Sequence, residues 1–292
     1  MRPILMRLLL PACVAGSLAA FFFARLTGAS IELAILLASL ATLAAAMALE
    51  PRMPLRADWN RPRGDRATDW TSFAVLAGAV QPLLNAASAL AVVWLYGASG
   101  AAQGLFGAGW PFAAQLLVVT LLAEFGKYWA HRWHHSTPAL WWLHALHHGS
   151  ERLYAINNFR VHPLEYAIKH ALSLLPLMLL GAPAEVLLGY IALTQPVQML
   201  QHANLPLRHG WLNNVFSTNT LHRWHHSARR GEGDVNFGSA LVLWDQVFGT
   251  FHHPGEARSP LRVGLYGNSV YPARQAFFSQ VLSMLRPPCC RA

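Results

Sequence analysis

Long apolar runs separated by short polar segments dominate the first half of the sequence. The runs Leu8–Ala24 and Leu33–Leu49 contain no charged residue, and each is about as long as the shortest helix that crosses a bilayer. Residues 70–123 also lack any charge, and they are long enough for two spans separated by the Gly-rich turn Gly97–Gly109. This pattern predicts four transmembrane helices.

The second half of the chain has one further apolar region, Ala171–Leu200, which Pro176, Pro183 and Pro196 interrupt. Proline removes a backbone donor and breaks helices, so we expect two short helices that form a hairpin without fully crossing the membrane. Residues 208–292 are more polar and are expected in the cytoplasm. The predicted fold is an all-α polytopic membrane protein with four transmembrane helices, a further broken apolar hairpin and a cytoplasmic histidine-rich helical cap.

The domain division that we expect places an N-terminal transmembrane hairpin and a basic cytoplasmic loop in residues 1–70. The membrane-embedded catalytic domain would then occupy residues 71–292.

Composition and charge support a membrane protein rather than a nucleic-acid-binding one. Hydrophobic residues make up 54% of the chain and charged residues only 12%, against about 25% charged in soluble domains. The formal charge of +9 fits basic loops on the cytoplasmic side of a bilayer. The loop of residues 50–69 carries five arginines, which places it and the N-terminus in the cytoplasm. A bacterial inner membrane is the expected location.

Histidine clusters are the most unusual feature of the sequence. The hexapeptide His-Arg-Trp-His-His-Ser occurs twice, at residues 131–136 and 222–227, and a third cluster lies at residues 144–148. Nine of the 15 histidines fall in these stretches. Positions i, i+3 and i+4 share one face of a helix, so each cluster presents two or three imidazoles in one direction. Three such clusters exceed the four ligands of a closed zinc site, and they are sufficient for two metal ions with open positions.

The choice of metal separates three function classes. Imidazole suits zinc, iron, copper and nickel. Iron is favoured because the clusters lie where spans meet the cytoplasm, within reach of both a lipid chain and a soluble electron donor. A zinc-dependent membrane hydrolase is the alternative, with one zinc and an acidic general base. A metal transporter is the third, although its ligands would lie near the bilayer midplane.

These residues resemble the fatty acid hydroxylase / sterol desaturase superfamily of integral membrane enzymes with a non-haem di-iron centre. The resemblance covers residues 112–253 and includes the family's three histidine boxes and its closing signature. The boxes are matched by His131 and His135, by His144, His147 and His148, and by His222, His225 and His226, while residues 236–251 match the closing signature. Arg160–Pro163 matches an R-x-H-P segment and His202–Asn204 an H-x-N segment.

The resemblance implies that the eight box histidines bind two ferrous ions, with His202 and His162 as further candidate ligands. It also implies dioxygen as co-substrate, a lipid substrate that is hydroxylated or desaturated, and no catalytic side chain beyond the metal ligands. The chain has no Gly-rich phosphate loop and no cysteine cluster for an iron–sulfur centre, so the electron donor is expected to be a separate protein. The oligomeric state is left open.

Several residues near the boxes have less defined roles. His134 lies inside the first box without being required by the family pattern, and a supporting role is expected for it. Asp245 is expected either to orient a ligand histidine or to fix a loop. Four histidines lie outside the pattern and are expected at the surface or the membrane interface: His170, His209, His252 and His253.

Overall fold

A computed structural model describes residues 2–99, 106, 109–272 and 276–286. Every regular element in these ranges is helical, and the only β-pairing there is two isolated bridges. The all-α prediction is therefore confirmed. The α-helices are α1 (Arg2–Thr27), α2 (Ile31–Leu49), α3 (Arg66–Val75), α4 (Gln81–Ser99), α5 (Phe112–Ser136), α6 (Pro138–His148), α7 (Pro163–Leu179), α8 (Ala184–Gln201), α9 (Asn219–His225), α10 (Leu243–Val247) and α11 (Phe277–Val281). Five short segments are 3-10 or π-helical: η1 (Ala57–Asn60), η2 (Leu76–Val80), η3 (Ala155–Phe159), η4 (Gly210–Asn214) and η5 (Leu282–Leu285).

Within the described residues, three helices are long and apolar enough to cross a membrane: Pro3–Thr27, Ile31–Leu49 and Arg66–Gly97. The third of these joins α3, η2 and α4 into one rod. Helix α5 corresponds to the predicted fourth span, but it continues to Ser136 and so carries the first histidine cluster at its end. Four spans therefore remain a prediction. Most of the Gly-rich turn lies outside the described residues.

Local sequence explains where the helices begin and end. The Ser30 side chain accepts a hydrogen bond from the Leu33 N–H and caps α2. Pro138 and Pro163 occupy the first positions of α6 and α7, where the missing N–H costs nothing. Pro183 separates α7 from α8, and Pro176 and Pro196 lie inside these two helices. The two helices exist as expected, but the prediction that they form a hairpin is wrong: α7 packs mainly against α5 and α4, and α8 packs mainly against α1, α2 and α5.

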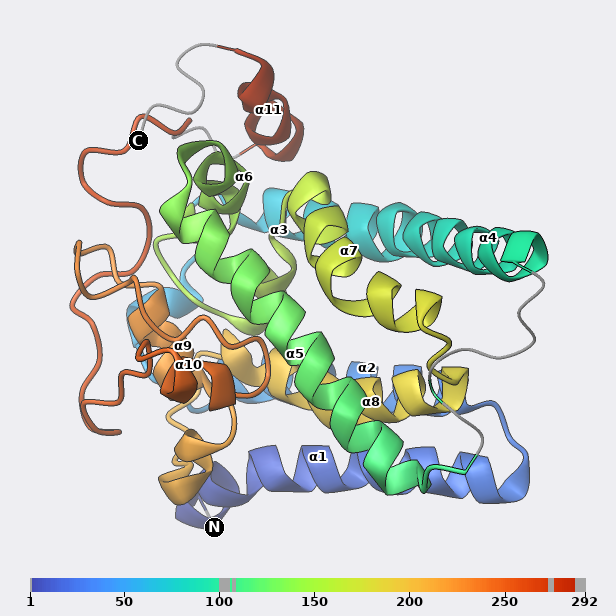
Figure 1. The fold of residues 1–292 in the computed structure, drawn as a ribbon. Coiled ribbons are helices and arrows are strands. Elements are labelled where there is room, and N and C mark those ends of the chain that lie inside the picture. The colour runs from blue at the N-terminus through green and yellow to red at the C-terminus, as the bar shows by residue number, and fades with distance from the viewer. Residues whose placement is uncertain (1, 100–105, 107–108, 273–275, 287–292) are drawn as a thin grey trace.

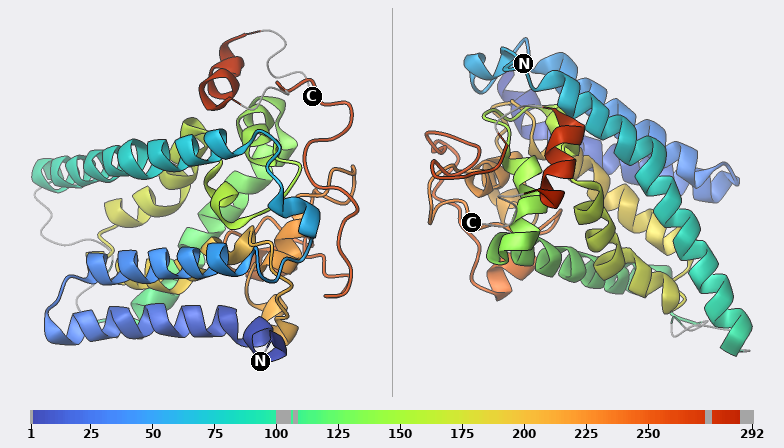
Figure 2. Two further views of the ribbon diagram at one scale, coloured as in Figure 1. Left: turned by 180° about the vertical axis from the view of Figure 1, so that it is seen from behind. Right: turned by 90° about the horizontal axis from the view of Figure 1, so that it is seen from above.

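Helices α1, α2 and α8 run roughly alongside one another, α5 crosses them obliquely, and the histidine-bearing elements gather at one end (Figure 1). Helices α1, α2 and α8 pack together around buried Leu10, Ala46 and Val197. Helix α4 packs mainly against α7 and stands out from the rest, as the view from above shows (Figure 2). Helices α6, α9 and α10 lie on the left side of the view in Figure 1. This arrangement keeps the apolar helices on one side of the histidine clusters.

Buried Glu50 attaches the end of α2 to the histidine-bearing end. Its carboxylate accepts hydrogen bonds from the backbone N–H of Ala155 at 2.7 Å and of Asn204 at 2.9 Å. Ala155 follows the second cluster, and Asn204 follows His202. Hydrogen bonds to a buried charge are stronger than neutral ones, so Glu50 fixes two segments that carry candidate ligands.

Gly126 allows α5 and α7 to cross closely. A Cβ atom at this position would lie 2.0 Å from the backbone oxygen of Leu172. We expect Gly126→Ala to lower the free energy of unfolding by about 1–3 kcal/mol, the usual cost of overpacking, because only backbone movement can relieve the clash. The thermal midpoint in detergent measures this. Gly16→Ala is the matched control, since nothing lies within 4 Å of its Cβ position, and an equal loss in both variants would contradict the crossing argument.

Candidate metal centre

Four helices bring the clustered histidines together. The last two turns of α5 carry His131 and His135, and α6 carries the second cluster. His202 ends α8, and α9 with the residue after it carries the third cluster. Helical spacing turns the rings of each cluster to one side, and the packing of the four helices makes those sides face one another.

The histidines divide into two groups of four. The first histidine group is His131, His135, His144 and His225, and the second histidine group is His147, His202, His222 and His226. In each group, one ring nitrogen per residue lies within 4.8 Å of the others. His148 lies between the groups and forms a third set with His225 and His226. The third box therefore contributes to both groups.

The first histidine group presents unprotonated nitrogens to one another. His131 donates its Nδ1–H to the Phe237 carbonyl at 2.8 Å, and His144 donates its Nδ1–H to the Glu165 carboxylate at 2.7 Å. In the neutral rings, each Nε2 atom is then unprotonated and carries a lone pair, and the two Nε2 atoms lie only 3.0 Å apart. Two lone pairs at that distance repel each other unless a cation lies between them. This geometry fits a metal ion.

Two rings of the second histidine group are held in the same way. His147 donates its Nδ1–H to the Arg160 carbonyl at 3.2 Å, and His202 donates its Nδ1–H to the Asn157 side-chain oxygen at 2.7 Å. The inward Nε2 of His202 lies 2.9 Å from that of His222, and the Nε2 of His147 lies 3.1 Å from that of His226. Such hydrogen bonds fix the ring orientation of metal ligands in proteins.

Burial keeps these rings neutral. The enclosed position lowers the pKa of His147 and of His222 to about 3, because desolvation disfavours the charged imidazolium. Both rings are therefore unprotonated at neutral pH, which is the form that binds a metal. The Nε2 of His135 is buried without a hydrogen-bond partner among the described residues. It is therefore a further nitrogen that is available to a metal.

Nine of the ten predicted ligands lie in these sets, and His162 does not. The Nδ1 of His162 accepts the Leu164 N–H at the start of α7, and its Nε2–H donates to the Val281 carbonyl at 3.2 Å. Both nitrogens of His162 are therefore in use, and its task in the structure is to cap α7. His134 is also outside the groups, and its Nδ1–H donates to the Ala130 carbonyl.

Asp245 acts on the centre through a loop. Its carboxylate accepts the N–H groups of Phe237 and Gly238 at 2.7 and 2.8 Å and the Thr250 hydroxyl at 2.7 Å. It makes no direct bond to a histidine of the two groups, so of the two roles expected for it the loop-fixing one agrees with the structure. The loop it fixes presents the Phe237 carbonyl to His131.

Sequence reasoning missed three side chains that hold candidate ligands. They are Glu165 at His144, Asn157 at His202, and Asp234, whose carboxylate accepts the Nδ1–H of His135 at 3.2 Å. Asn157 lies in the polar stretch that follows the second cluster. No motif marks the other two, because the contacts join residues 21 and 99 positions apart.

The expectation of surface positions for the remaining histidines is wrong for two of them. His170 is buried between α7 and α4, where its Nε2 lies 2.8 Å from the Ser88 hydroxyl. His209 is buried beside α9 and hydrogen-bonds the Asn219 side-chain oxygen at 2.8 Å. Each of these rings hydrogen-bonds a polar side chain on a neighbouring segment, which offsets the free-energy cost of burying the imidazole. His252 and His253 are half-buried.

Residues 116–250 match the fatty acid hydroxylase family. The chain is 37% identical over 218 residues to the ornithine lipid hydroxylase OlsE of Rhizobium tropici, a match that covers 74% of this chain and 66% of that protein. It is 29% identical over 153 residues to human alkylglycerol monooxygenase, covering 52% of this chain and 34% of the relative. The zebrafish (Danio rerio) enzyme is 30% identical over 142 residues, with 49% and 31% covered.

These matches define the class of protein. Residues 116–250 form a fatty acid hydroxylase domain, and the relatives that match are oxidoreductases by their names. It matches just under two thirds of the length of OlsE and about one third of the alkylglycerol monooxygenases. No solved structure matches the chain.

Glu165 offers a test of the first histidine group. It is fully buried and accepts hydrogen bonds from both His144 and Lys169, at 2.7 and 2.6 Å. We expect Glu165→Gln to weaken metal binding at the first group about 10- to 100-fold, the usual loss when the partner of a ligand histidine is changed. Competitive titration with a chelator measures this. The second group should keep its affinity, and equal weakening at both would contradict the assignment of Glu165 to one group.

Proposed function

We propose that the two histidine groups bind two iron ions and that the chain hydroxylates a membrane lipid with dioxygen. The observation that carries the proposal is the pair of adjoining histidine groups, in the first of which the Nε2 atoms of His131 and His144 face each other without protons. Imidazole nitrogens suit iron, and the fatty acid hydroxylase domain supports the same cofactor. Nine histidines are in place for ligation: His131, His135, His144, His147, His148, His202, His222, His225 and His226.

Bound iron would supply the activation of dioxygen and the removal of hydrogen from an unactivated carbon. The side chains of this protein provide the surroundings of that reaction. The Phe237 carbonyl and Glu165 hold two rings in their metal-binding tautomer. Burial of the groups excludes bulk water, and the apolar helices on one side lead a lipid chain from the bilayer to them. No acid or base side chain is needed at the reacting carbon.

Hydroxylation is favoured over desaturation and over ether cleavage, and a polar bacterial lipid is the favoured substrate. OlsE, whose name describes hydroxylation of ornithine lipid, matches this chain over a longer stretch and at higher identity than the alkylglycerol monooxygenases. We infer that the metal centre faces the cytoplasm at the bacterial inner membrane, because the Arg-rich loop lies at the same end as the histidines. A separate protein would supply the electrons.

The direct test is the lipid profile of bacteria that make ornithine lipids and express this chain under isotopically labelled dioxygen. We expect a polar lipid to gain one labelled oxygen atom, as seen by mass spectrometry. His147→Ala should abolish the product. His252→Gln, a histidine outside both groups, should retain it. Oxygen that came from water, or release of a free acid without oxygenation, would contradict the proposal and favour the zinc hydrolase.

A zinc hydrolase would need a carboxylate that takes a proton from metal-bound water. Glu165 and Asp234 are the carboxylates that contact the histidines, each through one oxygen, and the Oε2 of Glu165 has no partner among the described residues. Metal content therefore separates the hydrolase from the di-iron proposal. Transport is disfavoured, because both groups lie at the ends of the long helices, where the histidine-bearing elements gather (Figure 1).

A further inference from the structure

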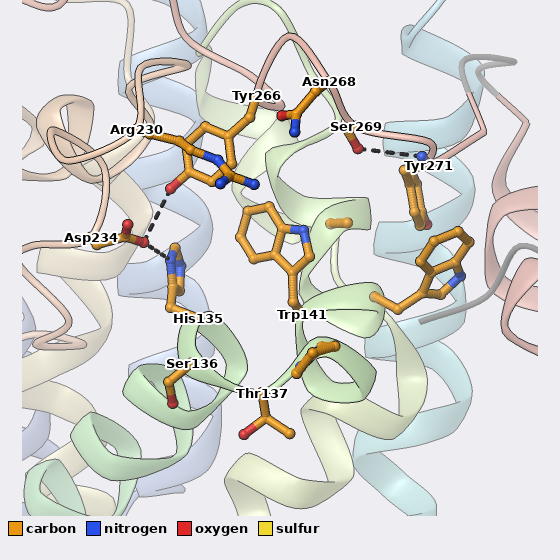
Figure 3. Close-up of a pocket in the computed structure, with 13 residues that line it drawn as sticks. His135, Ser136, Thr137, Trp141, Arg230, Asp234, Tyr266, Asn268, Ser269 and Tyr271 are labelled. Atoms are coloured by element: carbon orange, nitrogen blue, oxygen red, sulfur yellow. Dashed lines mark hydrogen bonds and ion pairs between the residues drawn. The ribbon is translucent and has the colours of Figure 1, made fainter. Parts of the chain in front are cut away.

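A cavity of about 250 Å³ borders the first histidine group, between the end of α5, α6 and the segment 266–271 (Figure 3). His135 forms part of its wall. Two Trp–Tyr pairs also line it: Trp141 with Tyr266, named here the relay pair, and Trp142 with Tyr271, named the control pair. The two pairs have the same composition, and their tryptophans are neighbours on α6.

Only the relay pair contacts the candidate metal ligands. The Trp141 ring centroid lies 5.1 Å from that of His135 and 5.3 Å from that of His148. The Tyr266 ring stacks on Trp141 at 5.6 Å with an interplanar angle of 12°. The control pair is in contact at 5.2 Å, but among the described residues neither of its rings contacts a histidine. Trp141 and Tyr266 therefore form a continuous aromatic path from the ligands to the cavity.

Tyr266 has a proton acceptor in place. Its hydroxyl donates to the Asp234 carboxylate at 3.1 Å (Figure 3), and the Asp234 side chain is 49% exposed. A phenol loses its proton when it loses an electron, because the phenol radical cation is a very strong acid. A carboxylate within hydrogen-bond distance therefore makes one-electron oxidation of Tyr266 far easier than oxidation of an isolated phenol.

We propose that Tyr266 and Trp141 form an electron relay that quenches the oxidised metal centre when no lipid is bound. The relay rests on the proposed function for its oxidant, an iron centre oxidised by dioxygen or peroxide. One electron passes from the Tyr266 phenol through the Trp141 indole to the metal, whose oxidation state falls by one. The phenol proton passes to Asp234. A soluble thiol restores Tyr266 by giving up one hydrogen atom, two thiyl radicals join as a disulfide, and Asp234 releases its proton to water.

The relay has a clear benefit for this centre. The nearest oxidisable groups to the metals are the ligand imidazoles, and damage to them destroys the site. Tryptophan and tyrosine are the side chains that give up one electron most readily after thiols. The relay moves the oxidising equivalent from the buried groups to Tyr266 at the cavity wall, where a small reductant reaches it.

The test uses the detergent-purified chain loaded with ferrous iron and mixed with hydrogen peroxide in the absence of lipid. Samples frozen within seconds are examined by electron paramagnetic resonance, and oxidised residues are mapped by peptide mass spectrometry. We expect a phenoxyl radical in the wild type. Tyr266→Phe should lose this signal and show more oxidation of His135 and His148, and Trp141→Phe should also lose it. Tyr271→Phe and Trp142→Phe should match the wild type. Equal iron content shows that each variant is folded.

Persistence of the radical in Tyr266→Phe, its loss in Tyr271→Phe, or peroxide consumption by the iron-loaded wild type with no phenoxyl radical would overturn the relay. Peroxide makes this test independent of lipid hydroxylation. A radical assigned to Tyr266 in a chain that hydroxylates no lipid would support the relay and refute the proposed function. If the chain hydroxylates lipid but histidine oxidation is unchanged in Tyr266→Phe, the proposed function is supported and the relay is refuted. A chain that binds no iron would overturn both.

Discussion

Replacing His131 and His147 together by alanine is expected to remove both metal ions and abolish oxygen-dependent lipid modification. Each variant histidine belongs to one of the two groups, and each offers an inward nitrogen about 3 Å from its neighbour's. A group that keeps three of its imidazoles loses its geometry and one neutral nitrogen ligand, and the proposed reaction would need both metals. Elemental analysis of the purified chain measures the metals, and labelled oxygen in the lipid measures the reaction.

The single variants separate the groups. His131→Ala is expected to lose the metal of the first histidine group and His147→Ala that of the second, each with complete loss of the lipid product. His252→Gln serves as the matched control, since it lies outside both groups. Retention of both metals in the double variant would show that the histidines form a polar core rather than a metal centre.

Arg152→Ala is expected to destabilise the protein by about 3–5 kcal/mol, the cost of removing one partner from a buried ion pair. Arg152 and Asp65 are each 2% exposed at the side chain, and two of their nitrogen–oxygen distances are 2.5 and 2.7 Å. Arg152 also donates to the Trp59 carbonyl at 2.6 Å. The substitution leaves Asp65 charged and buried, and it separates the basic loop from the segment after the second cluster.

The matched control for Arg152 is Arg63, which lies on the same loop as Asp65. Arg63 pairs with Glu151 at 3.0 Å, but these side chains are 42% and 62% exposed. Exposed pairs contribute about 0–1 kcal/mol, so Arg63→Ala should change the thermal midpoint in detergent little. Equal shifts in the two variants would contradict the claim that burial sets the strength of the Arg152 pair.

The candidate ligands could be predicted from the sequence, because the spacing that places histidines on one helix face involves only neighbouring positions. His131 with His135, and His222 with His225 and His226, share a helix face by position alone, so the convergence of the boxes was predictable from their repeat. The apolar runs likewise predict α1, α2, α7 and α8 as helices, whereas tertiary packing places α7 against α5 and α8 against α1 and α2. The length of the uncharged run does not show whether α5 crosses the membrane, because α5 continues beyond that run, through the first histidine cluster, to Ser136.

The division of the candidate ligands between the two histidine groups depends on how the helices pack. His225 belongs to the first histidine group, whereas His222 and His226 belong to the second, and no spacing rule divides a box between two sites. Packing of α9 against α6 and α8 decides it. His162 shows that a motif match does not fix a role: its segment resembles the family's R-x-H-P segment, but its ring caps α7. Glu165 and Asp234 could not be foreseen, because each reaches its histidine only through the folded chain.

The most direct test of the central claim is the metal content of the wild-type chain, purified in detergent from iron-replete cells. The two histidine groups predict close to two irons per chain. Zinc at one per chain, without iron, would contradict the di-iron centre and move the membrane hydrolase to the front.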